Sequence, residues 1–245
     1  MSAYDRSVFE ADDVDYSQPV ALFPLPTVSL FPHALQALHV FEPRYRQMVE
    51  DAAGDGGLES AAPIAMATFG ARDWRDDYGG TPPLRPVVCV GRLVRHQRRP
   101  DGRHDIVLHG VARARILAMH EPDGRRPYRM AEVVPLERPR AARPPMPAVR
   151  AALHELLSRP RLARVEAARQ VLECFGEREV PTHAAVEVAG YALVRDAEAR
   201  YRLLAEADPR RRAELVRDAI AELERLVALA ERQGSEEWPK GESWN

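Results

Sequence analysis

Side chains that perform covalent catalysis are scarce in this sequence. Lys240 is the only lysine among 35 basic residues, and it lies in a tail segment that has no helix or strand pattern. A Ser-Lys dyad or a Schiff base needs a lysine held in a fixed environment, so neither mechanism is expected. The sequence also has no Gly-x-Ser-x-Gly motif and no Gly-x-x-x-x-Gly-Lys-Ser/Thr motif, so we expect neither a nucleophile elbow nor a P-loop for ATP. These features predict a protein that is not an enzyme.

The cysteines and histidines do not form a metal-binding pattern. Cys89 lies in an apolar run typical of a strand, and Cys174 lies beside apolar residues on a predicted helix. Free cysteine is usually a small buried hydrophobe, so we expect neither a disulfide nor a reactive thiol. His104 and His109 have opposite parity on a predicted strand, which points them to opposite faces. With no Cys-x-x-Cys or His-Glu-x-x-His motif either, no metal and no cofactor is predicted.

Arginine is concentrated in one part of the chain. Residues 85–143 contain 14 arginines and six acidic residues, whereas the whole chain has a formal net charge of −2. Such a basic patch could bind RNA through its phosphates, and this alternative would use Arg98, Arg99 and Arg103. The other interpretation is that outward arginines solvate a sheet and pair with acidic segments. A net charge near zero favours this second interpretation.

The elements that would position these side chains begin with strands. From residue 20 to residue 137 the pattern is one of short strands separated by turns, which is typical of a small barrel or curled sheet. Pro-Asp-Gly triplets at 100–102 and 122–124 predict turns in which proline fixes φ and glycine supplies a positive φ. The first triplet should close a hairpin, and Gly91 before it predicts a β-bulge. The predicted strands span residues 36–41, 62–69, 86–96, 104–112, 115–119 and 128–136.

The segment before and after residue 40 has its own pattern. Prolines at positions 24, 26 and 32 each remove a backbone donor, so the segment favours a short edge strand and turns over a helix. Pro43 suits the first position of a helix, which we expect over residues 43–53. Apolar residues at helical spacing predict its buried face, namely Tyr45, Met48, Val49 and Ala52.

A charged segment rich in glycine and proline follows at residues 70–83. Most polar irregular segments only connect elements, so a surface loop is one interpretation. The other is a binding loop in which Trp74 and Tyr78 anchor a partner. The sequence leaves both open.

Helices replace strands in the second half of the chain. Residues 139–147 are rich in proline and predict a stiff, extended linker. Five helices follow, and the last begins at Asp208 and Pro209. The predicted core residues of the five are Leu153, Leu156 and Leu157; then Leu162, Val165, Leu172 and Phe175; then Val186, Ala189 and Leu193; then Tyr201, Leu203 and Leu204; then Leu215, Ala219, Leu223, Leu226, Val227 and Ala230.

The chain resembles the Lon N-terminal domain family in two stretches. The first is LFPLPTVSLFPHA at 22–34 followed by LHVFEPRYR at 38–46, and the second is a series of strand segments between residues 90 and 133. The resemblance covers nearly all of residues 20–138, and the helical half is similar to the part that follows in bacterial Lon. It departs at His33, where many relatives carry glycine, so the local turn geometry is in question.

The resemblance implies an α+β protein with a PUA-like β pseudo-barrel followed by a C-terminal helical bundle. It also implies recognition of polypeptide substrates, here without the ATPase and peptidase domains. The predicted division is a flexible acidic segment at 1–18, the barrel domain at 19–138, the linker at 139–147, the bundle at 148–233 and a flexible tail at 234–245.

Polypeptide binding without catalysis is therefore the predicted function. The expected partners are unfolded or degron-bearing polypeptides or a partner protein, with a separate protease as a further candidate. An extended peptide could add to a barrel edge, or apolar side chains could dock between barrel and bundle. No apolar run approaches roughly 18 residues and no secretory signal is evident, so the expected compartment is the cytoplasm. The residues predicted for the binding surface are Leu35, Leu38, Tyr45, Trp74 and Tyr78.

Overall fold

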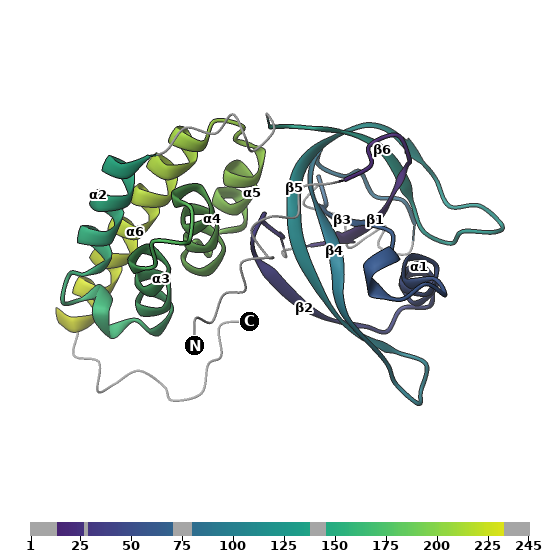
Figure 1. Cartoon of the computed structure of the whole chain (residues 1–245), viewed down its shortest axis with the longest axis horizontal. Helices are drawn as coiled ribbons and strands as arrows, with labels where there is room; N and C mark the ends of the chain where they lie inside the picture. Colours follow the sequence, from purple (N-terminus) through teal and green to yellow (C-terminus); the bar gives the residue numbers. More distant parts are fainter. Residues whose placement is uncertain (1–13, 27–28, 71–79, 138–145, 233–245) are drawn as a thin grey trace.

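A computed structural model describes residues 14–26, 29–70, 80–137 and 146–232. A curled β-sheet forms one half of the molecule and a helical bundle the other (Figure 1), which confirms the predicted α+β class. The strands are β1 (Val20–Leu25), β2 (Leu35–Val40), β3 (Ile64–Thr68), β4 (Val87–Arg98), β5 (His104–His120) and β6 (Met130–Pro135). The helices are α1 (Pro43–Ala53), α2 (Pro147–Leu157), α3 (Glu166–Gly176), α4 (Thr182–Leu193), α5 (Ala197–Ala205) and α6 (Pro209–Arg232).

The sheet has the strand order β2-β5-β4-β3-β1-β6, and β5 also pairs with β6. Because β5 bonds both to β4 and to the strand at the far end of this order, the sheet curls back on itself. Only β1 and β3 run parallel among these described pairs. The register of β4 and β5 shifts at Gly91, which confirms the predicted bulge.

The strands predicted at residues 104–112 and 115–119 form one strand, so their separation was wrong. β5 runs unbroken from His104 to His120, and a register shift between Ile116 and Ala118 bends it along the curl. The charge of Arg113 interrupts the apolar pattern of this strand. That side chain is nevertheless buried, since it points into the junction with the bundle.

The two Pro-Asp-Gly turns differ. Gly102 has a φ of 79°, and the amide of Arg99 donates to the carbonyl of Arg103 at 2.8 Å, so the first turn closes the predicted hairpin. Gly124 does not have the expected positive φ. The carboxylate of Asp123 holds this second turn instead, because it accepts hydrogen bonds from two backbone amides at 2.7 Å.

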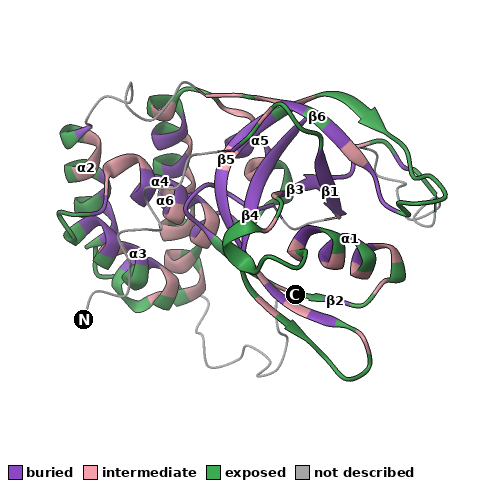
Figure 2. Ribbon diagram, turned by 45° about the vertical axis from the view of Figure 1, so that its right-hand side comes forward, coloured by how far each residue is buried: buried purple, intermediate pink, exposed green. Residues whose placement is uncertain are grey.

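Helix α1 covers one side of the sheet, as Figure 2 shows. It spans the predicted residues, and its predicted face, Tyr45, Met48, Val49 and Ala52, is buried. Upstream of it, buried His33 adopts a φ of 65°, in the left-handed region that favours glycine. The departure from the family pattern at this position therefore keeps a turn geometry suited to glycine.

The bundle confirms most of the predicted helical core. Leu153, Leu156 and Leu157 are buried in α2, and the predicted apolar residues of α4 and α5 are buried as well. The second predicted helix is divided into a 3-10 turn (Leu162–Arg164) and α3. Within it, Val165 and Leu172 are only partly buried.

The predicted buried face of α6 is confirmed only in part. Leu215, Ala219 and Leu223 are partly buried against the core, but the fully buried residues are Arg212, Ala213, Val216 and Ile220, and Leu226 is 54% exposed. The buried face is displaced by about one residue position, or about 100°, around the helix from the predicted face. The charged residue Arg212 lies on the buried face because it pairs with two buried carboxylates.

Four buried charges join the sheet to the bundle, and we call them the junction quartet: Arg113, Glu137, Glu187 and Arg212. Arg113 on β5 contacts Glu187 on α4 at 2.5 Å and Glu137 after β6 at 2.8 Å. Arg212 on α6 contacts the same two carboxylates at 2.9 and 3.1 Å. Each side chain is at most 8% exposed. Two cations and two anions therefore balance within the junction, as buried charges require.

Both cysteines behave as predicted. Cys89 and Cys174 are buried and form no disulfide. Burial raises the pKa of the Cys89 thiol well above its ordinary value. The thiol therefore stays protonated and unreactive at neutral pH.

Candidate functional site

Strand β2 pairs with β5 on one side, and no strand in the described part of the chain pairs with its other side. The backbone groups of one residue in an antiparallel strand point to the same side, and successive residues alternate. Two carbonyls show which residues point outward. The carbonyl of Leu35 accepts a hydrogen bond from the hydroxyl of Tyr191, and that of Ala37 accepts one from the side chain of Gln36. We call the outward backbone groups of Leu35, Ala37 and His39 the β2 edge.

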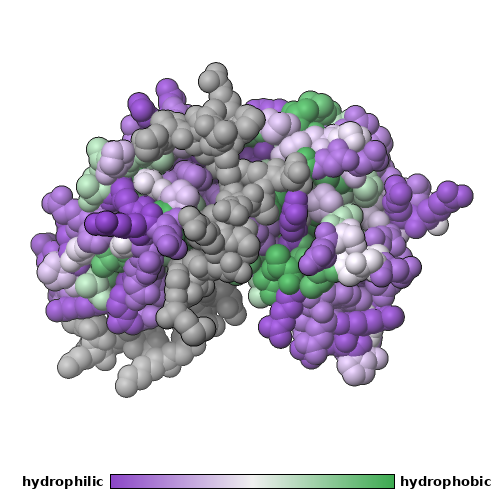
Figure 3. Space-filling model, in the orientation of Figure 1, coloured by the Kyte–Doolittle hydropathy of each residue, from purple (hydrophilic) through white to green (hydrophobic). Residues whose placement is uncertain are grey.

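Apolar side chains accompany the β2 edge. Leu35 is 52% exposed, and Phe41, directly after β2, is 60% exposed. Across the sheet, Ala37 pairs with Val107 of β5, and Val94 lies in the neighbouring bulge of β4 with 45% exposure. Figure 3 shows hydrophobic side chains gathered at the surface over β2, surrounded by hydrophilic ones. An apolar patch beside an unpaired strand edge is an arrangement that can take up an extended peptide.

Ion pairs surround the far end of β2. The ring of His39 lies 2.7 Å from the carboxylate of Asp105, which also contacts Arg99 at 2.6 Å. Hydrogen bonds from Arg99 and then from His39 lower the pKa of Asp105 below its ordinary value. The carboxylate therefore stays charged and holds the side chains of Arg99 and His39 close to the sheet.

A histidine pair lies beneath the same end of the strand. His104 is fully buried opposite Val40, and its Nδ1 lies 2.7 Å from Nε2 of His96. Burial and then the neighbouring His96 lower the pKa of His104, so it is neutral at pH 7. Its Nε2 lies 3.4 Å from Glu50 of α1. Both ring nitrogens thus face protein groups, and in the described residues no three His, Cys, Asp or Glu side chains are arranged as a metal site.

The residues predicted for polypeptide binding are placed differently from one another. Leu35 lies exposed on the β2 edge, whereas Leu38 points to the opposite face and packs against the core. Tyr45 is 4% exposed, and its ring packs against Phe23 with centroids 4.8 Å apart. Trp74 and Tyr78 lie outside the described residues.

The arginines of the RNA alternative each contact an acid. Arg98 lies 3.4 Å from Glu50, Arg99 is held by Asp105, and Arg103 lies 3.3 Å from its neighbour Asp101. These contacts match the interpretation in which the arginines pair with acidic residues at the sheet surface. They leave fewer positive charges for phosphate than the composition suggested.

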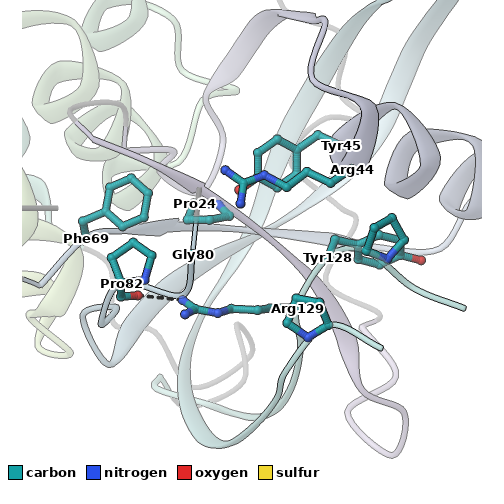
Figure 4. A pocket seen from close by; sticks show the side chains of 10 residues that line it. Pro24, Arg44, Tyr45, Phe69, Gly80, Pro82, Tyr128 and Arg129 are labelled. Atoms are coloured by element: carbon teal, nitrogen blue, oxygen red, sulfur yellow. Dashed lines mark hydrogen bonds between the residues drawn. The ribbon is translucent and has the colours of Figure 1, made fainter. Parts of the chain in front are cut away.

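A small cavity near Tyr45 does not provide a ligand site. Its lining includes Pro24, Arg44, Phe69 and Arg129 (Figure 4), and its volume is about 20 Å³. That volume holds about one water molecule. The guanidinium of Arg129 already donates to the carbonyl of Pro82 at 2.7 Å, as the dashed line in Figure 4 shows. The cavity is therefore a packing feature of the sheet.

Sequence reasoning missed the most accessible residues of the site. Ala37, His39 and Phe41 form or flank the β2 edge, yet none was predicted. The available signal was the alternation along residues 35–41, in which every second residue differs from its neighbours in burial. The sequence alone does not say which strand lies at an edge, because that depends on the pairing of the whole sheet.

The fold and this site define an α+β domain in which a curled mixed sheet, fixed to a helical bundle, presents an accessible strand edge. The chain belongs to the family of the ATP-dependent protease La (LON) substrate-binding domain, whose model matches residues 19–222. The resemblance noted in the sequence is thereby confirmed. The match includes α2 to α5 and much of α6 as well as the sheet.

Two solved structures share the fold. One is the N-terminal domain of the Lon protease of the Mycobacterium avium complex, with a TM-score of 0.61, 18% identity, and 84% of this chain and 99% of that chain covered. The other is a Lon N-terminal domain protein from Xanthomonas campestris, with a TM-score of 0.56, 22% identity, and coverage of 86% and 98%. A search of curated proteins found no match. Within the described residues, no helix has the length and apolar character to cross a membrane.

Proposed function

We propose that the protein binds polypeptide segments in an extended conformation and that the bound segment adds to β2 as a further strand. The observation that carries this proposal is the outward-facing backbone of Ala37 and His39, which pairs with no strand of the described chain. Membership of a substrate-binding family supports the polypeptide as ligand. The domain acts by binding and performs no chemistry on the segment.

The binding mode follows from strand geometry. A peptide next to β2 exchanges backbone hydrogen bonds with Ala37 and His39, which supplies affinity for any sequence. Alternate peptide side chains then lie beside Leu35 and the small side chain of Ala37, where burial of apolar surface favours hydrophobic residues. Unfolded polypeptides expose both features. Folded proteins keep both features inside, so the β2 edge selects unfolded segments.

Proline at position 37 tests this mode. The amide of Ala37 points away from β5, so Ala37→Pro removes an outward donor and leaves the pairing with β5 in place. We expect binding of reduced, carboxymethylated lactalbumin, a permanently unfolded chain, to weaken by at least about tenfold, or about 1.4 kcal/mol. Fluorescence anisotropy with the labelled chain measures this change.

Ala37→Val is the matched control, because it keeps the amide and suits a strand. It should bind as the wild type does, and both variants should keep the wild-type thermal midpoint. Equal binding by the proline variant and the wild type would rule out strand addition at β2. Tighter binding of a single-stranded RNA, lost steeply between about 50 and 200 mM salt, would instead favour the arginine alternative.

Two further aspects belong to the proposal. The bound segment could be passed to a protease on a separate chain, and co-purification of the protein with such a protease tests this transfer. The proposed compartment is the cytoplasm, which cell fractionation tests.

A further inference from the structure

The apolar surface of helix α6 continues beyond its fully buried residues. Leu215, Ala219 and Leu223 are partly buried at the margin of the core and, with the end of α4 and with α5, line a groove of about 540 Å³. Further along the same helix, Leu226 and Leu229 are 54% and 51% exposed. The groove and these exposed leucines form a continuous apolar strip of three to four helical turns. We call it the α6 strip.

The two sides of the groove carry opposite charges. Arg195 and Arg202 lie on the side of α4 and α5, and both are exposed with no carboxylate partner among the described residues. Asp196 also lines this side, but its carboxylate accepts a hydrogen bond from the amide of Ala199 at 2.8 Å, and the two arginines outnumber it. Asp218 and Glu222 lie on the α6 side. Within the part of the chain that the structure describes, they pair with arginines of their own helix, in exposed contacts of the kind that contribute little to stability.

This pattern is complementary to itself. Across the surface of one copy, the basic side comes first, then the apolar strip, then the acidic side. A second copy turned by 180° about an axis parallel to α6 presents these three in the reverse order. The basic side of each copy therefore meets the acidic side of the other. An axis perpendicular to α6 in the same plane would set like charges together. Two-fold interfaces use the same patch on both copies and need this kind of complementarity.

We propose that the α6 strip binds the α6 strip of a second copy of this chain, with the two α6 helices parallel about a two-fold axis. The apolar strip forms the centre of the interface and the four charged residues form its rim, which is the usual composition of a specific interface. Arg195 and Arg202 of each copy face Asp218 and Glu222 of the other.

Sedimentation velocity of the full chain tests the proposal. We expect a dimer at micromolar concentration and a monomer for the double variant Ala219→Glu with Leu226→Glu, because two buried carboxylates would face their copies. Leu117→Glu is the matched control, since Leu117 is an equally apolar residue of β5 with 63% exposure. It should remain a dimer, and circular dichroism confirms that each variant is folded.

Exchange of the rim charges identifies the orientation. A copy with Arg195→Glu and Arg202→Glu, and a copy with Asp218→Arg and Glu222→Arg, should each be monomeric because like charges meet. An equimolar mixture should form a heterodimer that native mass spectrometry resolves. A wild-type protein that stays monomeric to about 100 μM, well above ordinary dimer affinities, would overturn the proposal. So would a dimer that these charge variants leave intact.

Discussion

At the scale of single residues, the junction quartet places four charged side chains in the interior. Burying a charge costs desolvation free energy, and attraction to an oppositely charged partner compensates for this cost only while that partner is present. Arg113 also donates to the carbonyl of Leu204, and Arg212 to that of Glu206. Both cations are thus bonded to carboxylates and to backbone, which fixes their position at the junction.

Removal of one cation should therefore be costly. Arg113→Met keeps an extended apolar side chain but leaves Glu137 and Glu187 with one cation between them. We expect the free energy of unfolding to fall by about 3–5 kcal/mol, as urea denaturation would measure. Arg159→Met, which breaks the exposed pair with Glu224, is the control and should cost less than about 1 kcal/mol. Equal costs for the two variants would contradict the role assigned to burial.

At the scale of elements, a local sequence pattern predicts whether a segment is a helix or a strand. It predicts less well which face of that element is buried. Helix α1 was predicted in full because Pro43 and the spacing of Tyr45, Met48, Val49 and Ala52 agree. Helix α6 was predicted as a helix, but its predicted apolar residues lie only at the margin of the core. The fully buried face includes Arg212, which is held there by partners on other elements that no local pattern contains.

The edge position of β2 gives a prediction for this strand. Its inward amides, at Gln36, Leu38 and Val40, bond to β5 and should exchange slowly with solvent. The outward amides of Ala37 and His39 should exchange quickly in the free protein. Bound unfolded polypeptide should slow these two amides at least about tenfold, as exchange followed by nuclear magnetic resonance would show. Unchanged exchange on binding would place the ligand elsewhere.

At the scale of the whole molecule, the fold class and family could be inferred from the sequence because their signals lie in contiguous motifs. The β2 edge could not be inferred from the sequence. A strand lies at an edge when no other strand pairs with one of its sides, and this depends on the pairing of the whole sheet. The separation into domains at 19–138 and 148–233 remains a prediction. Physically, buried residues of the sheet and of the bundle belong to one apolar cluster, which extends from Phe23 through Leu108 to Val216.

That continuous cluster favours unfolding as one unit. Sheet and bundle share apolar contacts and the junction quartet, so neither should keep its stability when the other unfolds. We expect hydrogen exchange during a urea titration to give one midpoint for peptides of β5 and of α4. Two midpoints separated by more than about 0.5 M, a difference of about 1 kcal/mol, would indicate that the sheet and the bundle are independent.

The junction quartet also limits how this sequence can change over evolutionary time. A neutral substitution at any one of its four positions leaves an unbalanced charge in the interior. Only a second substitution, at a position of the opposite charge, restores neutrality. Lineages should therefore retain all four charges or replace opposite charges as matched sets, so that an alignment of relatives would show these positions varying in concert. The exposed arginines of the β4-β5 hairpin are not bound by this requirement, so they should be substituted individually among relatives.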